Sequence, residues 1–127
     1  MKLNKVKLDD DLTTKVRTLK ARTGLNPNIL CRIGFCLSLN EPGIPDTYRY
    51  LEDGMEFNRY TLTGEWDSLF IALLKERCLQ DNIDIETQLT DQFLAHLNRG
   101  ISLIYNRVKK ISDLQNLFSD SSMAYLD

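Results

Sequence analysis

Lysine and arginine are the residues of this chain whose number and spacing suit a specific chemistry, the binding of phosphate groups. Residues 1–40 hold eight Lys or Arg and three Asp, a net charge of +5, whereas residues 41–127 hold eight Lys or Arg and fifteen Asp or Glu, a net charge of −7. A basic N-terminal third on an acidic body predicts one surface that faces DNA. The alternative is that these lysines form salt bridges with the acidic body. The candidate DNA-binding residues are Lys2, Lys5, Lys7, Lys15, Arg17, Lys20, Arg22, Asn26 and Arg32.

Lys5 and Lys7 are the best candidates in this set because the segment around them alternates between apolar and charged residues. A strand has a side-chain period of two, so Val6 and Leu8 would face the core and both lysines would face outward. Outward lysines suit a contact to DNA phosphates or to bases in the major groove. An equally weighted alternative is an edge strand whose lysines only discourage aggregation.

The residues after this strand predict two helices joined by a tight turn. Three aspartates at 9–11 suit an N-cap and an acidic first turn, and Gly24 suits a left-handed helix end. Asn26 and Pro27 then predict the start of a second helix, which runs to about Leu39. Its free backbone N–H groups suit a phosphate. The basic residues of the first helix also suit the negative end of the helix dipole, which is an explanation without DNA.

The order strand, helix, turn and helix is that of a ribbon-helix-helix protein, in which two chains pair their strands and present the ribbon to DNA. Asn4 departs from this plan because an apolar residue is preferred there, so the ribbon between chains would be short or lost. The second helix is apolar almost all round, which predicts that it is buried and that a second subunit covers it. We therefore expect a homo-oligomer, at least a dimer. Phe35 should lie in a buried interface, within the subunit or between subunits, and Gly34 permits a close helix contact.

The fold class is mainly α, with the ribbon-helix-helix-like part (a short strand plus two helices) followed by further packed helices, including one long C-terminal helix. We expect a single domain over residues 1–127. Its parts are the basic ribbon-helix-helix-like part at 1–40, a loop with a short extended segment at 41–62, a helical part at 63–118 and a tail that frays at 119–127.

The helical part predicts two helices. Thr63 would cap the first and Asp84 would cap the second, whose apolar residues recur every three or four positions. Gly100 would kink or split the second helix. Lys109 and Lys110 lie near its end, where the helix dipole explains them without DNA. The helix that begins at Thr63 would have an apolar stripe made of Trp66, Leu69, Phe70, Leu73 and Leu74.

Other residue types give no catalytic pattern. His96 is the single histidine, and no two cysteines have the C-x-x-C spacing of a zinc site. Cys31 and Cys36 lie in the most apolar helix, which suits neither a disulfide nor an activated nucleophile for sulfur transfer. We expect no catalytic residue, no metal and no cofactor, and hence no enzyme. One alternative, a carboxylate metal site for DNA cleavage, would use Asp46, Glu52, Asp53 and Glu56.

Targeting signals are also missing from the pattern of the sequence. No apolar run approaches the length of a membrane span, and the lysine-containing N-terminus lacks the apolar core of a signal peptide. We therefore expect a cytoplasmic protein without a membrane partner.

Two runs of residues carry a resemblance to a known family. The first, from Arg22 to Pro45, reads RTGLNPNILCRIGFCLSLNEPGIP, and the second, from Glu56 to Arg77, reads EFNRYTLTGEWDSLFIALLKER. Together they resemble the family of the DNA sulfur modification protein DndE, and the resemblance covers essentially the whole chain. It implies a small, mostly helical, DNA-binding accessory subunit of the phosphorothioation machinery, in which sulfur replaces a non-bridging phosphate oxygen of DNA.

The resemblance further implies a tetramer, and as partners a sulfurtransferase-like subunit and an ATPase subunit. The leading hypothesis is a non-catalytic subunit that binds double-stranded DNA through phosphate contacts, with a preference for nicked or distorted duplex left open. The runner-up is a structural adaptor of the modification complex that does not contact DNA. A third hypothesis, a sequence-specific repressor, is weaker because Leu3 offers little to read bases beside Lys5 and Lys7.

Overall fold

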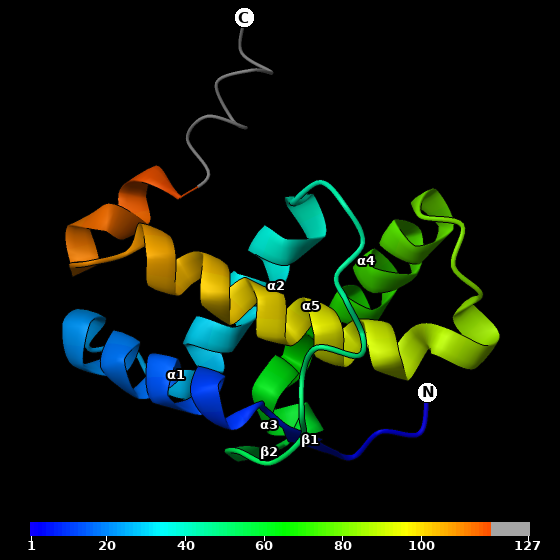
Figure 1. Ribbon diagram of the computed structural model, residues 1–127, viewed down its shortest axis with the longest axis horizontal. Coiled ribbons are helices and arrows are strands. Elements are labelled where there is room, and N and C mark those ends of the chain that lie inside the picture. Colours follow the sequence, from blue (N-terminus) through cyan, green and yellow to red (C-terminus); the bar gives the residue numbers. More distant parts are fainter. Residues whose placement is uncertain (118–127) are drawn as a thin grey trace, which may run out of the picture.

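The structure of the chain is a computed structural model that describes residues 1–117, and the predicted tail lies outside them. It is mainly helical, with a short strand before the first two helices, as predicted (Figure 1). In chain order the elements are β1 (Lys5–Lys7), α1 (Asp10–Thr23), α2 (Pro27–Asn40), β2 (Glu56–Asn58), α3 (Arg59–Thr63), the 3-10 turn η1 (Gly64–Trp66), α4 (Asp67–Gln80), α5 (Ile85–Arg107) and the 3-10 turn η2 (Ile111–Asn116).

The ends of α1 and α2 are set by the capping residues that the sequence predicts. The carboxylate of Asp9 accepts a hydrogen bond from the backbone N–H of the second helical residue at 3.0 Å. Gly24 follows α1 with φ of 76°, the left-handed conformation that a glycine adopts without strain. The side chain of Asn26 caps α2 by accepting from the N–H of Ile29 at 3.1 Å. The predicted boundaries of both helices are therefore confirmed.

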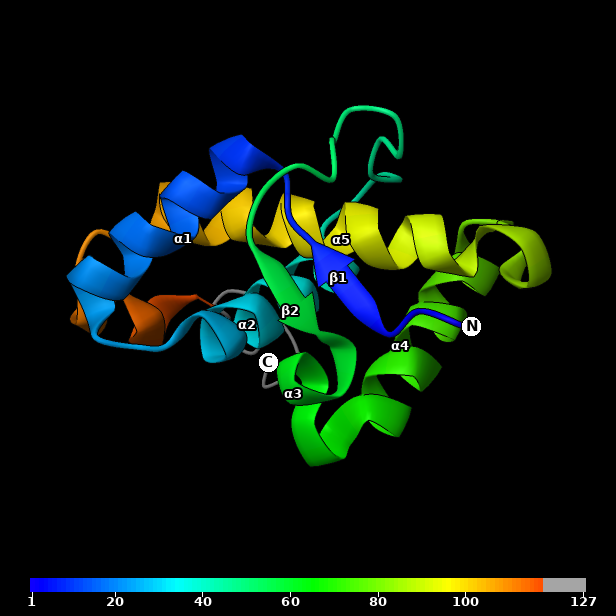
Figure 2. The ribbon, with the colours of Figure 1, turned by 90° about the horizontal axis from the view of Figure 1, so that it is seen from below.

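The strand β1 pairs with the strand β2 of the same chain. It runs antiparallel to β2, with Val6 opposite Phe57 and both side chains buried. The segment between α2 and β2 returns the chain to β1, so the two strands lie side by side below α5 (Figure 2). The ribbon-helix-helix plan needs a strand from another subunit at this place. Here the chain's own β2 supplies the hydrogen-bonding partner, because residues 56–58 return to β1.

The centre of the fold is the crossing of α2 and α5. The two backbones meet at Gly34 and Gly100, where a Cβ added to Gly34 would lie 2.8 Å from the carbonyl carbon of Gly100. The close contact predicted at Gly34 is thus confirmed. Gly100 does not split the long helix, which is continuous from Ile85 to Arg107. Its lack of a side chain serves the packing of α2 against α5.

Phe35 on α2 lies in the core of the chain itself. Its side chain is 3% exposed, and its ring centroid lies 5.2 Å from that of Phe93 on α5 and 5.9 Å from that of Phe70 on α4. The apolar surface of α2 is therefore covered by α5, α4 and α3 of the same chain. Burial of α2 does not require a second subunit, and the homo-oligomer stays a prediction.

The helix α4 differs from the sequence prediction in its start and in its buried face. Thr63 is not its cap, because α3 and η1 intervene and α4 begins at Asp67. Most of the predicted apolar stripe faces outward, with Trp66 55%, Leu69 51% and Leu73 42% exposed. The helix is apolar on more than one side, and only the side that carries Leu74 packs fully into the core.

Candidate nucleic-acid interface

The strand β1 places its two lysines on the outer face of the sheet. Lys5 and Lys7 are exposed and Val6 between them is buried, as the alternation predicts. The strand β2 sets their neighbours: Asn58 is opposite Lys5, and Glu56 is opposite Lys7. Residues directly opposite in an antiparallel pair share a face of the sheet. One of the two lysines thus has a carboxylate residue beside it.

The helix α1 adds an exposed basic pair. Arg17 and Lys20 are both exposed and lie three residues apart, which makes them neighbours on the helix surface. Lys2 is exposed in the segment before β1. This segment is held by the buried Arg59, whose guanidinium donates to the carbonyl oxygens of Met1 and Leu3.

A second group of cations surrounds Tyr105, near the end of α5. Lys15 Nζ lies 5.4 Å from the ring centroid, Arg22 Cζ 4.8 Å and Lys109 Nζ 5.2 Å. Lys15 and Arg22 come from α1, and Lys109 follows α5. The fold therefore joins two predicted DNA-binding residues to a lysine that the sequence analysis left out. Lys109 lies beyond the end of α5, so the i, i+4 spacing of a helix does not place it beside Tyr105, and the sequence gives no signal for this contact.

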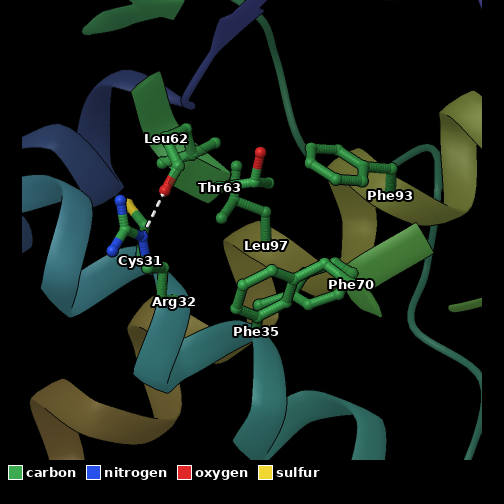
Figure 3. A pocket seen from close by; sticks show the side chains of 8 residues that line it. All are labelled: Cys31, Arg32, Phe35, Leu62, Thr63, Phe70, Phe93 and Leu97. Carbon is green, nitrogen blue, oxygen red and sulfur yellow. Dashed lines mark hydrogen bonds between the residues drawn. The ribbon is translucent and has the colours of Figure 1, made fainter. Parts of the chain in front are cut away.

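Arg32 and Asn26 use their polar groups inside the chain. The Arg32 guanidinium donates to the carbonyl oxygen of Leu62 at 2.6 Å (Figure 3). It also donates to the carbonyl oxygen of Thr61 at 3.2 Å. It thereby caps α3 at the edge of a small apolar cavity of about 10 Å³, room for one water at most. The Asn26 side chain is occupied as the cap of α2. Asn26 and Arg32 therefore have fewer free hydrogen-bonding groups for DNA than Lys5 and Lys7 on β1.

The ion pairs of the described residues all belong to the acidic body. Within residues 1–117, no Lys or Arg of residues 1–40 lies within 4.0 Å of a carboxylate oxygen. The alternative that the N-terminal cations are neutralised by salt bridges therefore finds no support within the described residues. The three ion pairs are Arg59–Asp67 at 2.9 Å, Arg77–Asp81 at 2.8 Å and Arg107–Glu41 at 3.1 Å.

The cysteines lack the environment of a nucleophile. Burial raises the pKa of Cys31 to about 12, and burial also raises the pKa of Cys36 and of Cys78. A thiolate is the reactive form, and these three side chains stay protonated at neutral pH. The arrangement therefore does not suit sulfur transfer through a protein thiol.

His96 and the carboxylates have structural surroundings. His96 is fully buried on α5, and its Nδ1 lies 2.8 Å from the hydroxyl of Ser38. Of the four carboxylates considered for a metal site, Asp53 accepts a hydrogen bond from the backbone N–H of Asp10. Nowhere in the described part of the chain do three or more His, Cys, Asp or Glu residues come together as metal ligands would.

The fold and these surfaces define a class of protein: a small, mainly helical protein with a two-stranded sheet and a basic first helix whose cations have no carboxylate partners in residues 1–117. The family model described as DNA sulphur modification protein DndE matches residues 5–112. The chain belongs to the DndE family. No curated protein matches it significantly.

Solved structures of DndE proteins are similar to this chain. One is the crystal structure of DndE from Escherichia coli B7A, involved in DNA phosphorothioation modification, with 25% identity and a TM-score of 0.65. The similarity covers 80% of this chain and 96% of that chain. Another is a DndE double glycine-to-lysine mutant, with 24% identity and a TM-score of 0.63 over 80% of this chain and 97% of that chain.

Proposed function

We propose that this chain is a non-catalytic subunit of the DNA phosphorothioation machinery that binds double-stranded DNA. Membership of the DndE family supports a role in DNA sulfur modification. The raised thiol pKa values support a role without covalent chemistry at a cysteine. Among residues 1–117, no helix combines the length and apolar content that crossing a membrane requires. We place the protein in the cytoplasm because its substrate class is DNA.

One observation carries the DNA-binding part of the proposal. The lysines and arginines of residues 1–40 have no carboxylate partner within the described residues, whereas three arginines of the acidic body do. An exposed cation without a partner is available to a phosphate, and binding then releases the counterions condensed on DNA. Lys5 and Lys7 are the proposed contacts on β1, and Arg17 and Lys20 those on α1.

This mechanism makes the binding insensitive to base sequence. Phosphate contacts position a protein on a duplex but carry no sequence information directly. A nick or distortion changes the path of the phosphates, so a preference for nicked duplex belongs to the same proposal. The experiment below therefore compares intact with nicked duplexes.

A structural adaptor is the second candidate, and the exposed side of α4 favours it. Leu69 and Leu73 lie four residues apart on this side and are substantially exposed, as is Trp66 just before α4. Beside them, a groove of about 340 Å³ between α2 and α4 is lined by Leu73, Cys36 and Leu39, among others. Exposed apolar surface of this kind marks a contact site. We propose that this surface binds partner chains, which are further copies in a dimer or tetramer or the sulfurtransferase-like and ATPase subunits of the modification complex.

The proposal is tested by a salt titration of the wild-type protein. Affinity is measured for two unrelated duplexes of equal length, each intact and with one nick, over a series of salt concentrations. DNA binding through phosphates predicts equal affinities for the two sequences. It also predicts that the logarithm of the affinity falls linearly with the logarithm of the salt concentration. If the protein binds none of the duplexes measurably at low salt, DNA binding is rejected and the adaptor is favoured.

A further inference from the structure

We propose that Tyr105 gathers Lys15, Arg22 and Lys109 into a binding site for one phosphate group of the DNA backbone. The inference rests on the proposed function, and it adds to that function a site at the other end of α1 from the lysines of β1. Its ligand is a phosphodiester oxygen, and Tyr105 is a positioning residue that acts through the three cations.

The packing of α1 along α5 builds the site. The backbone N–H of Asp9 donates to the side-chain oxygen of Asn98 at 3.1 Å, and Arg22 Nη1 donates to the carbonyl oxygen of Val108 at 3.3 Å. The two helices are thus tied at the start and at the end of α1, and they run in the same direction (Figure 2). This fixes Lys15 and Arg22, two turns apart on α1, against the residues that end α5.

Three positive charges at one place need compensation, and two features of α5 supply it. The face of an aromatic ring carries negative charge density and attracts a cation within about 6 Å. The carbonyl oxygens at the end of a helix carry the negative end of its dipole. Two of them receive the cations directly: Lys109 Nζ donates to the carbonyl oxygen of Tyr105 at 3.2 Å, and Arg22 donates to that of Val108.

Capping of α5 alone does not explain the cluster. Arg22 and Lys109 satisfy carbonyl oxygens at the end of the helix, but the Lys15 side chain makes no hydrogen bond or ion pair within residues 1–117, and its ammonium group lies over the ring. A lysine has three N–H donors and an arginine five. Most of these donors on the three side chains have no acceptor in the described chain, so they are available to an anion.

The carboxylate of Asp113 bonds to the backbone beside the site and leaves its cations unpaired. Asp113 accepts hydrogen bonds from the backbone N–H groups of Lys109 at 2.8 Å and Lys110 at 3.1 Å. These bonds lower the pKa of Asp113, so it stays ionised at neutral pH. Its carboxylate makes no ion pair with the ammonium of Lys109 within 4.0 Å. It holds the turn that carries Lys109 toward Tyr105.

The position of the site suits a second contact on the same duplex. The helix α1 has 14 residues, and a helix of that length spans about 20 Å. Lys7 precedes the start of α1, and Arg22 lies in its last turn. The separation of the two basic groups is shorter than one turn of B-DNA, about 34 Å. The Tyr105 site therefore supplies an anchor that the lysines of β1 do not reach.

The test compares four variants with the wild-type protein on one duplex over a salt series. Lys15→Ala/Lys109→Ala removes two cations, Tyr105→Leu removes the ring, Tyr105→Phe keeps the ring without its hydroxyl, and Lys75→Ala on α4 is the control. We expect the salt slope to fall by about one unit in the double variant. We expect a fall for Tyr105→Leu as well, and wild-type slopes for Tyr105→Phe and Lys75→Ala. The melting temperature of each variant tests whether it is folded. If Tyr105→Leu does not fold, the salt slope of the double variant alone decides whether the site binds a phosphate.

A wild-type slope in the double variant would overturn the Tyr105 site and leave the proposed function standing, since binding itself persists. Absence of duplex binding by the wild-type protein would overturn both. Inorganic phosphate alone distinguishes the source of the ligand. Phosphate could raise the melting temperature of the wild-type protein but not that of the double variant, while the double variant keeps the wild-type salt slope for DNA. This result would show that the site binds a free anion, and it would overturn the proposal that it binds a backbone phosphate.

Discussion

Gly34 and Gly100 bring the backbones of α2 and α5 into direct contact. A Cβ on Gly34 would meet the carbonyl group of Gly100 and the next backbone N–H, and a Cβ on Gly100 would fall on the carbonyl of Gly34. Neither position has room for a side chain, and the atoms in the way are backbone that cannot rotate aside. The approach of these two helices sets the core in which Phe35, Phe93 and His96 lie.

Alanine at either glycine should destabilise the fold. Helix propensity alone predicts the opposite, because alanine in a helix interior is favoured over glycine by about 1 kcal/mol. Overpacking in a filled core typically costs about 1–3 kcal/mol. We expect Gly34→Ala and Gly100→Ala each to lower the free energy of unfolding, measured with urea. An unchanged or raised stability in both variants would show that the helices do not touch at this point.

The local rules of capping and turn formation account for what was predicted correctly about the fold. Gly24 and Asn26 mark the ends of α1 and α2 because a left-handed turn and an N-cap depend on the residue itself. The partner of β1 and the outward side of α4 depend on packing between distant segments, which residue patterns do not encode. Gly100 was read as a break for the same reason, because its partner Gly34 lies on another helix.

The free energy of unfolding should fall in mild acid because of His96. Burial lowers its pKa to about 3, and the neighbouring guanidinium groups of Arg99 and Arg77 act in the same direction. The unfolded chain binds a proton at the ordinary pKa near 6.5, so it holds more protons than the folded chain between these values. Stability is therefore present above pH 6.5 and is lost as the pH falls toward 3, by about 2 kcal/mol at pH 5.

Urea unfolding at pH 7 and at pH 5 checks this prediction, with His96→Gln as the matched variant. His96 is the single histidine of the chain, so few other groups titrate in this interval. The loss of stability between the two pH values should be smaller in His96→Gln by about 2 kcal/mol. Equal losses in both proteins would mean that His96 reaches solvent and is protonated without cost.

The exposed side of α4 should govern the size of the oligomer. Leu69→Lys/Leu73→Lys places two charges where an apolar contact is proposed, and we expect light scattering to give a smaller mass than for the wild-type protein. Leu79→Lys is the control, since Leu79 is 59% exposed on the same helix but does not line the groove between α2 and α4. A wild-type monomer at micromolar concentration would remove the basis of the prediction, and an unchanged mass of the double variant would place the interface elsewhere.

Glu56 should weaken the contact of Lys7 with DNA. Glu56 is directly opposite Lys7 on the outer face of the sheet, and both are exposed. An exposed ion pair contributes at most about 1 kcal/mol, so Glu56→Gln should raise the affinity for duplex DNA by no more than about fivefold. The gain should be absent when Lys7 is also replaced by Ala. A gain of the same size without Lys7 would show a general effect of net charge.

The candidate site was predictable only where adjacent residues build it. The alternation of β1 places Lys5 and Lys7 together, and it holds in the structure because it depends on the period of a strand. The group around Tyr105 joins residues more than 80 positions apart in sequence through α1 and α5. The helix dipole accounts for Lys109 from the sequence alone, and the structure places two cations from α1 beside it.

The most direct test of DNA binding is the salt dependence of Lys5→Ala/Lys7→Ala, measured beside the control Lys75→Ala on two unrelated duplexes. Lys75 is an exposed lysine on α4, an element that carries none of the proposed DNA contacts. If both lysines contact phosphates, the double variant loses affinity equally for the two duplexes and its salt slope falls by roughly two units. The control should keep the wild-type slope. A double variant that binds as tightly as the wild-type protein, with the same slope, would contradict phosphate binding by β1.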